Sequence, residues 1–257
     1  MKNNLITIIA IFVMAVTTSC KAQKPSNNKT DETCLSFIVD ATDRALFDEI
    51  NHDLHTNLQT FFKNAGIGKV CYNEKLTVRI APVDDNDKLS LKTASIALTD
   101  KKASKRDQAT MSDTRPLLRL ISTELARYDT LYNRQMKCSP IINVMLKTFR
   151  EMNPNATREI VVFCTDGVEF SSYGNFYKST PTTDESVTKM VGKIDSILLN
   201  EAKTRIEEVS PLVVIVLKAN SKANAAQLKL FYSKFMGQLG VTRVSFIDNL
   251  SNNPNLY

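Results

Sequence analysis

Two acidic residues follow mainly apolar stretches that have the character of buried strands. Asp40 comes directly after residues 35–39, and Asp166 comes after residues 160–164 with Thr165 in between. Because the carboxyl ends of parallel strands meet at one edge of a sheet, we expect these side chains to lie close together. Carboxylate and hydroxyl oxygens are the ligands that a hard cation such as Mg²⁺ prefers. A divalent-cation site at this edge is therefore one interpretation of the two motifs.

The elements needed to position these acids alternate along the chain. We expect strands at residues 35–40, 76–83, 93–98, 159–164, 211–217 and 241–247. We expect helices at residues 45–65, 116–125, 140–149, 184–209 and 223–239, where apolar side chains recur at helical spacing. The order predicts an α/β fold, with a doubly wound, mostly parallel central sheet, an antiparallel edge and helices on both faces.

The order of elements, together with three motif loops, resembles a von Willebrand factor type A domain over residues 35–250. The resemblance implies a Rossmann-type three-layer fold and a metal-ion-dependent adhesion site at the carboxyl edge of the sheet. The first loop of that family reads Asp-x-Ser-x-Ser, the second supplies a hydroxyl before a helix, and the third is Asp-Gly. The residues at these positions are Asp40, Thr42 and Arg44, then Ser139 before Pro140, then Asp166.

Arg44 departs from the family motif, which has a hydroxyl at that position. In one interpretation Arg44 turns away, and Asp40, Thr42, Ser139 and Asp166 hold Mg²⁺ or another divalent cation in a degenerate site. In the other, which we favour, Arg44 pairs with Asp40 or Asp166 and replaces the charge of the ion. A third interpretation is that the acids only cap helices and turns and bind no ligand.

The first residues of the chain have the pattern of an export signal. Lys2 precedes the apolar residues 5–16, which are too few to span a bilayer comfortably. The small residues before Cys20 resemble the lipobox of bacterial lipoproteins, although Thr17 stands where that family usually has Leu. This resemblance implies a signal peptide at residues 1–19 and a lipid anchor on Cys20, which would attach the protein to a membrane. The alternative is an ordinary secretory signal in which Cys20 is incidental.

Polar segments flank the expected domain. Residues 20–34 lack hydrophobic periodicity and are interpreted as a flexible tether, while residues 251–257 form an Asn-containing tail. The net charge is +6, but basic and acidic residues are interspersed, and the densest basic stretch at residues 101–106 contains no aromatic side chain. We therefore expect no nucleic-acid partner. The usual glycine-rich nucleotide fingerprints are also absent from the sequence.

Four cysteines remain besides Cys20. An exported protein permits disulfides, so Cys34 could pair with Cys71, and Cys138 could pair with Cys164. The alternative is that these are free thiols, which we favour for Cys164 because it lies in an expected core strand.

We interpret the chain as a membrane-anchored bacterial envelope lipoprotein that acts as a protein-binding or scaffolding module, not as an enzyme. Its contact surface would be the acidic edge with Arg44, Thr165 and the loop at residues 169–181. The expected partner is an envelope protein that offers a carboxylate to a bound metal or to Arg44. One alternative is a metal-dependent phosphoester hydrolase that uses the same edge, although no general base lies near the motifs. Another is a structural envelope protein whose edge is closed.

Overall fold

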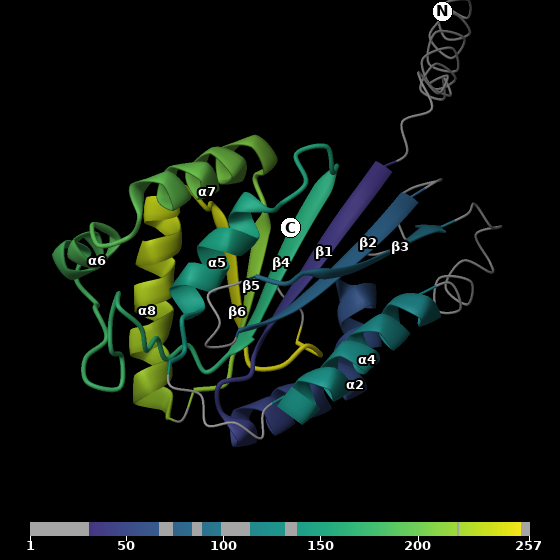
Figure 1. Ribbon diagram of the computed structural model, residues 1–257, viewed down its shortest axis with the longest axis horizontal. Coiled ribbons are helices and arrows are strands. Elements are labelled where there is room, and N and C mark those ends of the chain that lie inside the picture. The colour runs from purple at the N-terminus through teal and green to yellow at the C-terminus, as the bar shows by residue number, and fades with distance from the viewer. Residues whose placement is uncertain are drawn as a thin grey trace, which may run out of the picture. The chain divides into compact units, whose positions relative to one another are not determined.

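The computed structural model describes residues 31–66, 74–83, 89–98, 114–131, 138–219 and 221–252 (Figure 1). Its strands are β1 (Asp31–Asp40), β2 (Glu74–Val83), β3 (Lys92–Leu98), β4 (Arg158–Thr165), β5 (Leu212–Leu217) and β6 (Arg243–Ile247). Its helices are α2 (Arg44–Asn64), α4 (Arg115–Leu131), α5 (Ile141–Arg150), α6 (Asp184–Val191), α7 (Ser196–Val209) and α8 (Lys222–Leu239).

The strands form one sheet in the order β3-β2-β1-β4-β5-β6. Every neighbouring pair is parallel except β2 with β3, which is antiparallel. Helices α2 and α4 cover one face, and α5, α7 and α8 lie on the other (Figure 1). This confirms the predicted α/β fold with a mostly parallel central sheet, an antiparallel edge strand and helices on both faces.

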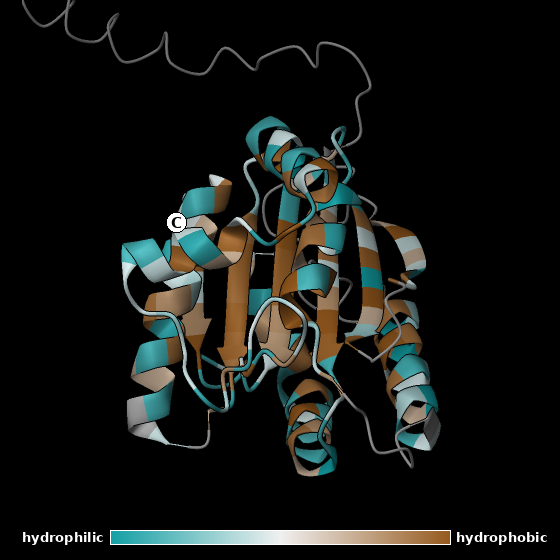
Figure 2. Cartoon of the chain, turned by 60° about the vertical axis from the view of Figure 1, so that its left-hand side comes forward, coloured by the Kyte–Doolittle hydropathy of each residue, from teal (hydrophilic) through white to brown (hydrophobic). Residues whose placement is uncertain are grey.

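The alternation of side chains along β1 divides the core into two layers. Ile38 packs with the helices on the α5 face, whereas Phe37 and Val39 pack with α2 and α4. Successive strand residues point to opposite faces, so an apolar run is needed where both faces are covered. Figure 2 shows that the central strands are coloured mainly as hydrophobic, as expected for strands between two layers of helices.

The register between β1 and β4 brings the two acidic motifs to the same edge. Val39 is paired with Cys164, so the next residues, Asp40 and Thr165, both end their strands there. Thr165 is in turn paired with Leu217, the last residue of β5. The prediction that both acids come to the carboxyl edge of one parallel sheet is therefore confirmed.

Two predicted boundaries were wrong. Strand β1 begins at Asp31, so residues 31–34, which the sequence pattern assigned to the tether, belong to the sheet. The single helix expected at residues 184–209 is divided into α6 and α7. Gly192 ends α6, and the Asp195 carboxylate caps α7 by accepting bonds from the main-chain nitrogens of residues 197 and 198 at 3.0 and 2.9 Å. The apolar periodicity continued across this cap and concealed it.

The cysteines that the structure describes do not form the disulfide expected between Cys138 and Cys164. Cys34, Cys138 and Cys164 are thiols that belong to no disulfide. Burial raises the pKa of the Cys34 thiol to about 11, which keeps it protonated at neutral pH. Cys71, the proposed partner of Cys34, lies outside the described residues.

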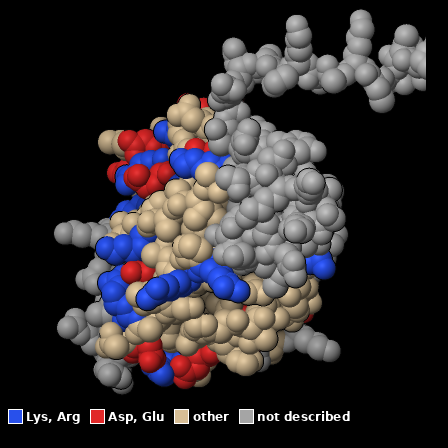
Figure 3. Space-filling model, turned by 90° about the vertical axis from the view of Figure 1, so that its right-hand side faces the viewer, with Lys and Arg blue, Asp and Glu red and all other residues tan. Residues whose placement is uncertain are grey.

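Several other predictions also fall outside the described residues. These are the signal peptide at residues 1–19, Cys20, the rest of the tether, the basic stretch at residues 101–106 and the tail beyond residue 252. Among the helices that the structure describes, none combines the length and the apolar character needed to cross a bilayer. On the face shown in Figure 3, Lys and Arg side chains occur together with Asp and Glu side chains.

Candidate functional site

Asp40 is the centre of the acidic edge and is completely buried. Its Oδ1 accepts bonds from the main-chain nitrogen of Thr42 at 3.1 Å and from the Thr42 hydroxyl at 2.7 Å. Its Oδ2 accepts a bond from the Thr165 hydroxyl at 2.6 Å. Burial raises the pKa of Asp40, while the bonds from Thr165 and Thr42 oppose this rise. The carboxylate is therefore oriented by two loops and removed from water.

Ser139 joins this cluster from the loop before α5. Its hydroxyl oxygen lies 3.2 Å from that of Thr42. The Thr42 hydroxyl has one proton, and when it donates that proton to Asp40 the Ser139 hydroxyl is the donor in the second bond. The main chain of Ser139 is held by Phe170, since each nitrogen donates to the other's carbonyl oxygen, at 2.8 and 3.0 Å. The second motif loop thus reaches the first, as the resemblance implied.

Asp166 supplies the second carboxylate, which is partly exposed. Its Oδ1 accepts a bond from the main-chain nitrogen of Val168 at 2.8 Å. Burial and then the negative charge of Asp40 raise the pKa of Asp166 to about 7. Within the described part of the chain, neither acid forms a salt bridge. When ionised, the two acids would hold negative charge at one edge with no salt-bridge partner among the described residues.

The turn after Asp166 has a conformation that favours glycine. Gly167 has a φ of +77°, a region that residues with a Cβ rarely adopt. Its nitrogen donates to the Thr165 hydroxyl at 2.9 Å, and its carbonyl oxygen accepts a bond from the Tyr232 hydroxyl at 3.0 Å. These bonds connect the third motif loop to Asp40 through Thr165 and to the core through α8.

Arg44 does not take the place of a cation, so the interpretation that we favoured from the sequence was wrong. It is the first residue of α2, and its side chain is 52% exposed. Its Nη2 lies 3.1 Å from Asp48 one turn further along α2, and its Nη1 pairs with Asp129 of α4. Residues four apart lie on the same side of a helix, which explains why the guanidinium turns along α2 and away from the acids. Arg44 therefore places no positive charge among the site oxygens.

The predicted caps also differ from those observed. Asp43, not Asp40, caps α2, by accepting a bond from the main-chain nitrogen of Leu46 at 2.9 Å. Helix α5 has Pro140 at its N-cap, and no side chain at that position supplies a capping bond. The hydroxyl of Ser139 is thus directed to the site cluster. Asp40 therefore does not cap a helix, but Asp40 and Asp166 each accept a bond from the main-chain nitrogen two residues further on, as expected for turn residues.

Glu169 is a site residue that the sequence reasoning did not single out. It is completely buried, and its Oε2 accepts a bond from the main-chain nitrogen of Ile142 at 2.8 Å, while the Ser171 hydroxyl donates to its Oε1. It therefore caps the start of α5 from a distant loop. Burial raises its pKa to about 7, and the charge of Asp40 adds to this effect. Its position three residues after Asp166 was the available signal.

The donor set fits a small, hard cation. Asp40 and Asp166 offer carboxylate oxygens, and Thr42 and Ser139 offer hydroxyl oxygens. Mg²⁺ is commonly held by one or two carboxylates and several waters. No cluster of three or more His, Cys, Asp or Glu side chains suited to a metal occurs among the described residues. A cation here would accordingly depend on the two acids, the hydroxyls and water.

Comparison with known proteins gives similarity at the level of architecture. No family model matches the chain, and no curated protein sequence matches it. Human COPII-coat protein Sec24c aligns with a TM-score of 0.41 at 9% identity, over 80% of this chain and 29% of that one. Manganese-loaded TRAP protein of Plasmodium vivax aligns with a TM-score of 0.34 at 10% identity, over 84% and 68% of the two chains.

Proximal thread matrix protein 1 from the mussel byssus aligns with a TM-score of 0.30 at 11% identity, over 82% of this chain and 47% of that one. This chain thus spans under a third of Sec24c and about half of the byssus protein. With TM-scores below 0.5, these likenesses carry no argument about what the chain binds or does.

Proposed function

We propose that this chain is an envelope lipoprotein whose α/β domain binds a protein partner through a divalent cation at the carboxyl edge of its sheet. Asp40, Thr42, Ser139 and Asp166 would hold the cation. A carboxylate of the partner would complete the set of oxygen ligands. The cation would act as a bridge of positive charge between two acidic surfaces.

The convergence of three loops on one group of oxygens carries this proposal. The Thr42 and Thr165 hydroxyls both bond to Asp40, Ser139 lies against Thr42, and Asp166 is close enough to Asp40 for the two charges to interact. A buried acid next to a partly buried one, with no salt bridge to either among the described residues, is costly unless the acids are protonated or bind a cation. A bound Mg²⁺ would remove that cost.

The position of Arg44 favours a bound cation over the alternative in which Arg44 itself neutralises the two acids. Because its guanidinium pairs with Asp48 and Asp129, it does not occupy the position of an ion among the site oxygens. Thr165 acts as an orienting residue in this proposal, since its hydroxyl contacts Asp40 and accepts from Gly167. Arg44 belongs to the rim and would meet the partner only outside the cation site.

The membrane anchor is proposed from the sequence of residues 1–20. A diacylglyceryl group on Cys20 would attach the domain to a bacterial membrane through the segment before β1. Incorporation of labelled palmitate into the wild-type chain, and its loss in the Cys20→Ser variant, would support the anchor. Equal labelling of both chains would overturn it.

We further propose that the domain binds and does not catalyse. The groups bonded to Asp40 and Asp166 in the described structure are hydroxyls and main-chain N–H donors, which do not accept a proton at neutral pH, and in this proposal the two carboxylates themselves serve as cation ligands. A metal-dependent hydrolase would need a group to activate water or a second metal. Release of phosphate from a generic phosphoester in the presence of Mn²⁺, lost in the Asp166→Asn variant, would overturn this proposal.

Calorimetric titration tests the cation site directly. We would titrate the detergent-solubilised full chain with Mg²⁺, Mn²⁺ and Ca²⁺ and compare it with the Asp166→Asn variant. Glu201→Gln is the matched control, because Glu201 is a half-exposed acid on α7 whose contact is Arg150. We expect binding in wild type and Glu201→Gln and its loss in Asp166→Asn. Absence of binding to every ion, or unchanged binding in Asp166→Asn, would contradict the proposal.

A further inference from the structure

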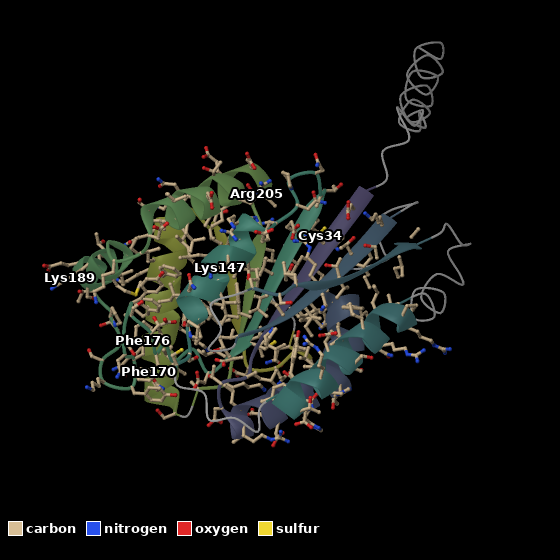
Figure 4. The ribbon with its side chains drawn as sticks, viewed as in Figure 1. Cys34, Lys147, Phe170, Phe176, Lys189 and Arg205 are labelled. Atoms are coloured by element: carbon tan, nitrogen blue, oxygen red, sulfur yellow. The ribbon has the colours of Figure 1, made fainter. Side chains whose placement is uncertain are left out.

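A groove lies between the loop at residues 169–181 and the first turns of α8. Its volume is about 270 Å³. The polar side chains that line it are those of Tyr177, Lys178, Ser179, Thr180, Asn224 and Gln227. Figure 4 labels Phe170 and Phe176, which belong to this loop. The groove is thus formed by two segments that are distant in sequence.

The loop wall of the groove is held in place by packing and main-chain bonds. The ring of Phe176 is buried against that of Phe231 on α8, with centroids 4.7 Å apart. The nitrogen of Phe176 donates to the carbonyl oxygen of Glu169 at 2.9 Å, and that of Lys178 donates to Asn175 at 3.1 Å. A surface that is already ordered loses less conformational entropy when a ligand binds.

The groove lies next to the acidic edge. Val168 lines the groove, and its nitrogen bonds to Asp166. Tyr177 also lines it, and burial together with the charges of Asp166 and Asp40 raises the pKa of its hydroxyl. The Tyr177 side chain is 67% exposed and packs edge to face with Phe170, which is 39% exposed. One ligand can therefore contact the edge, the aromatic pair and the groove together.

The chemistry of the lining suits a polypeptide that carries acidic residues. Lys178 is the charged side chain of the lining, and it is positive. The carboxamides of Asn224 and Gln227 can both donate and accept, as the main chain of an extended peptide does. Exposed aromatic rings favour an apolar side chain beside these polar contacts. The volume lies below the ~300–1,000 Å³ typical of small-molecule sites, which favours a short peptide segment over a bulky cofactor.

We propose that this groove is a second recognition subsite, which holds an extended acidic segment of the protein partner next to the cation. The inference rests on the proposed function and names the part of the partner that is recognised. One carboxylate of the segment reaches the cation held by Asp40 and Asp166. The following residues lie along Tyr177 and enter the groove, where Lys178 pairs with a second acid and Gln227 bonds to the main chain.

The two subsites are coupled through charge. Without the cation, the negative charges of Asp40 and Asp166 repel an acidic segment at close range. With the cation bound, the same edge attracts it. Binding of an acidic peptide should therefore require the divalent ion, whereas binding of the ion should not require the groove.

Short fluorescein-labelled synthetic peptides test the subsite by fluorescence polarisation. The probes carry two Asp residues separated by Leu and Phe, and the matched probes carry Asn in place of Asp. They are titrated with the full chain in detergent, with Mn²⁺ or with chelator. Lys178→Glu and Gln227→Ala alter the groove, and Lys189→Glu on α6 is the matched control for the change of charge (Figure 4). Thermal melting checks that each variant is folded.

We expect the Asp peptides to bind wild type and Lys189→Glu in Mn²⁺, and to bind Lys178→Glu more weakly by about tenfold or more. Gln227→Ala should weaken binding in the same direction, and calorimetric binding of Mn²⁺ should be unchanged in both groove variants. Equal peptide affinity in the groove variants and wild type would overturn the subsite, as would equal binding of Asp and Asn peptides. Loss of Mn²⁺ binding in wild type itself would instead overturn the proposed cation site.

Discussion

Replacement of Glu169 by Gln should change how the stability of the domain depends on pH. Glu169 is completely buried at the start of α5, where its carboxylate accepts bonds from the Ile142 nitrogen and the Ser171 hydroxyl. Gln has nearly the same shape and is neutral at every pH. The substitution therefore removes the ionisable proton while it keeps an acceptor oxygen at the helix start.

The magnitude follows from the pKa of Glu169. Burial raises it from 4.5 to about 7, so the folded protein retains a proton that the unfolded chain has lost. The stability linked to this proton is fully present below pH 4.5 and is lost as the pH rises through 7. The rise corresponds to about 3 kcal/mol of unfolding free energy. Above pH 7, Glu169→Gln should thus be more stable than wild type, and below pH 4.5 the two should be similar.

Urea denaturation between pH 4 and 8, in the presence of chelator, measures this difference. Asp166 titrates in the same range and affects both proteins. The informative quantity is therefore the difference in unfolding free energy between wild type and variant at each pH, not the pH dependence of either protein alone. Glu201→Gln serves as the control, because it makes the same change of side chain at a half-exposed position. The reasoning is refuted if the difference in unfolding free energy between Glu169→Gln and wild type is constant across this pH range.

Two further predictions concern the scaffold. Gly167→Ala should destabilise the domain by at least about 1 kcal/mol, because φ is +77° and a Cβ would lie 2.8 Å from Cδ1 of Leu217. Gly237→Ala is the control, because Gly237 lies on α8 with open space around it and its replacement should not destabilise the domain. The midpoints of urea denaturation measure both effects. Glu159→Gln should cost about 3–5 kcal/mol in the same assay, because it leaves the buried Arg79 guanidinium without its charged partner at 2.7 Å. A cost below about 1 kcal/mol would show that this ion pair contributes little to the stability of the domain.

The fold could be predicted because its strong signals are local. Residues 35–39 and 160–164 are apolar over the length of a strand covered on both faces, and the acids that follow mark the carboxyl ends. Residues 76–83 show the alternation of a strand, and a short polar segment separates them from residues 93–98, which favoured an antiparallel edge. Where the local pattern was continuous, as between α6 and α7, the cap at Asp195 could not be distinguished from a surface acid.

The site could be predicted only in part, because some of its contacts join residues that are far apart in the sequence. Asp40, Thr42 and Asp166 were found from their places after strands. The partner of Arg44 could not be found in this way, because Asp129 lies on a different helix and its approach depends on how α4 packs beside α2. Glu169 was missed for the same reason, since its capping role becomes evident only when the loop after β4 is seen against the start of α5.

The arrangement of these acids links binding to stability. Asp40 and Glu169 are buried and Asp166 is partly buried, and burial opposes the charged form of each. Apolar side chains of similar size would avoid this cost. A cation that binds the folded edge and not the unfolded chain would stabilise the fold in proportion to its affinity. If the edge has only a structural role, Mg²⁺ should leave the melting temperature of wild type and of Asp166→Asn equally unchanged, whereas a cation site requires an increase in wild type alone.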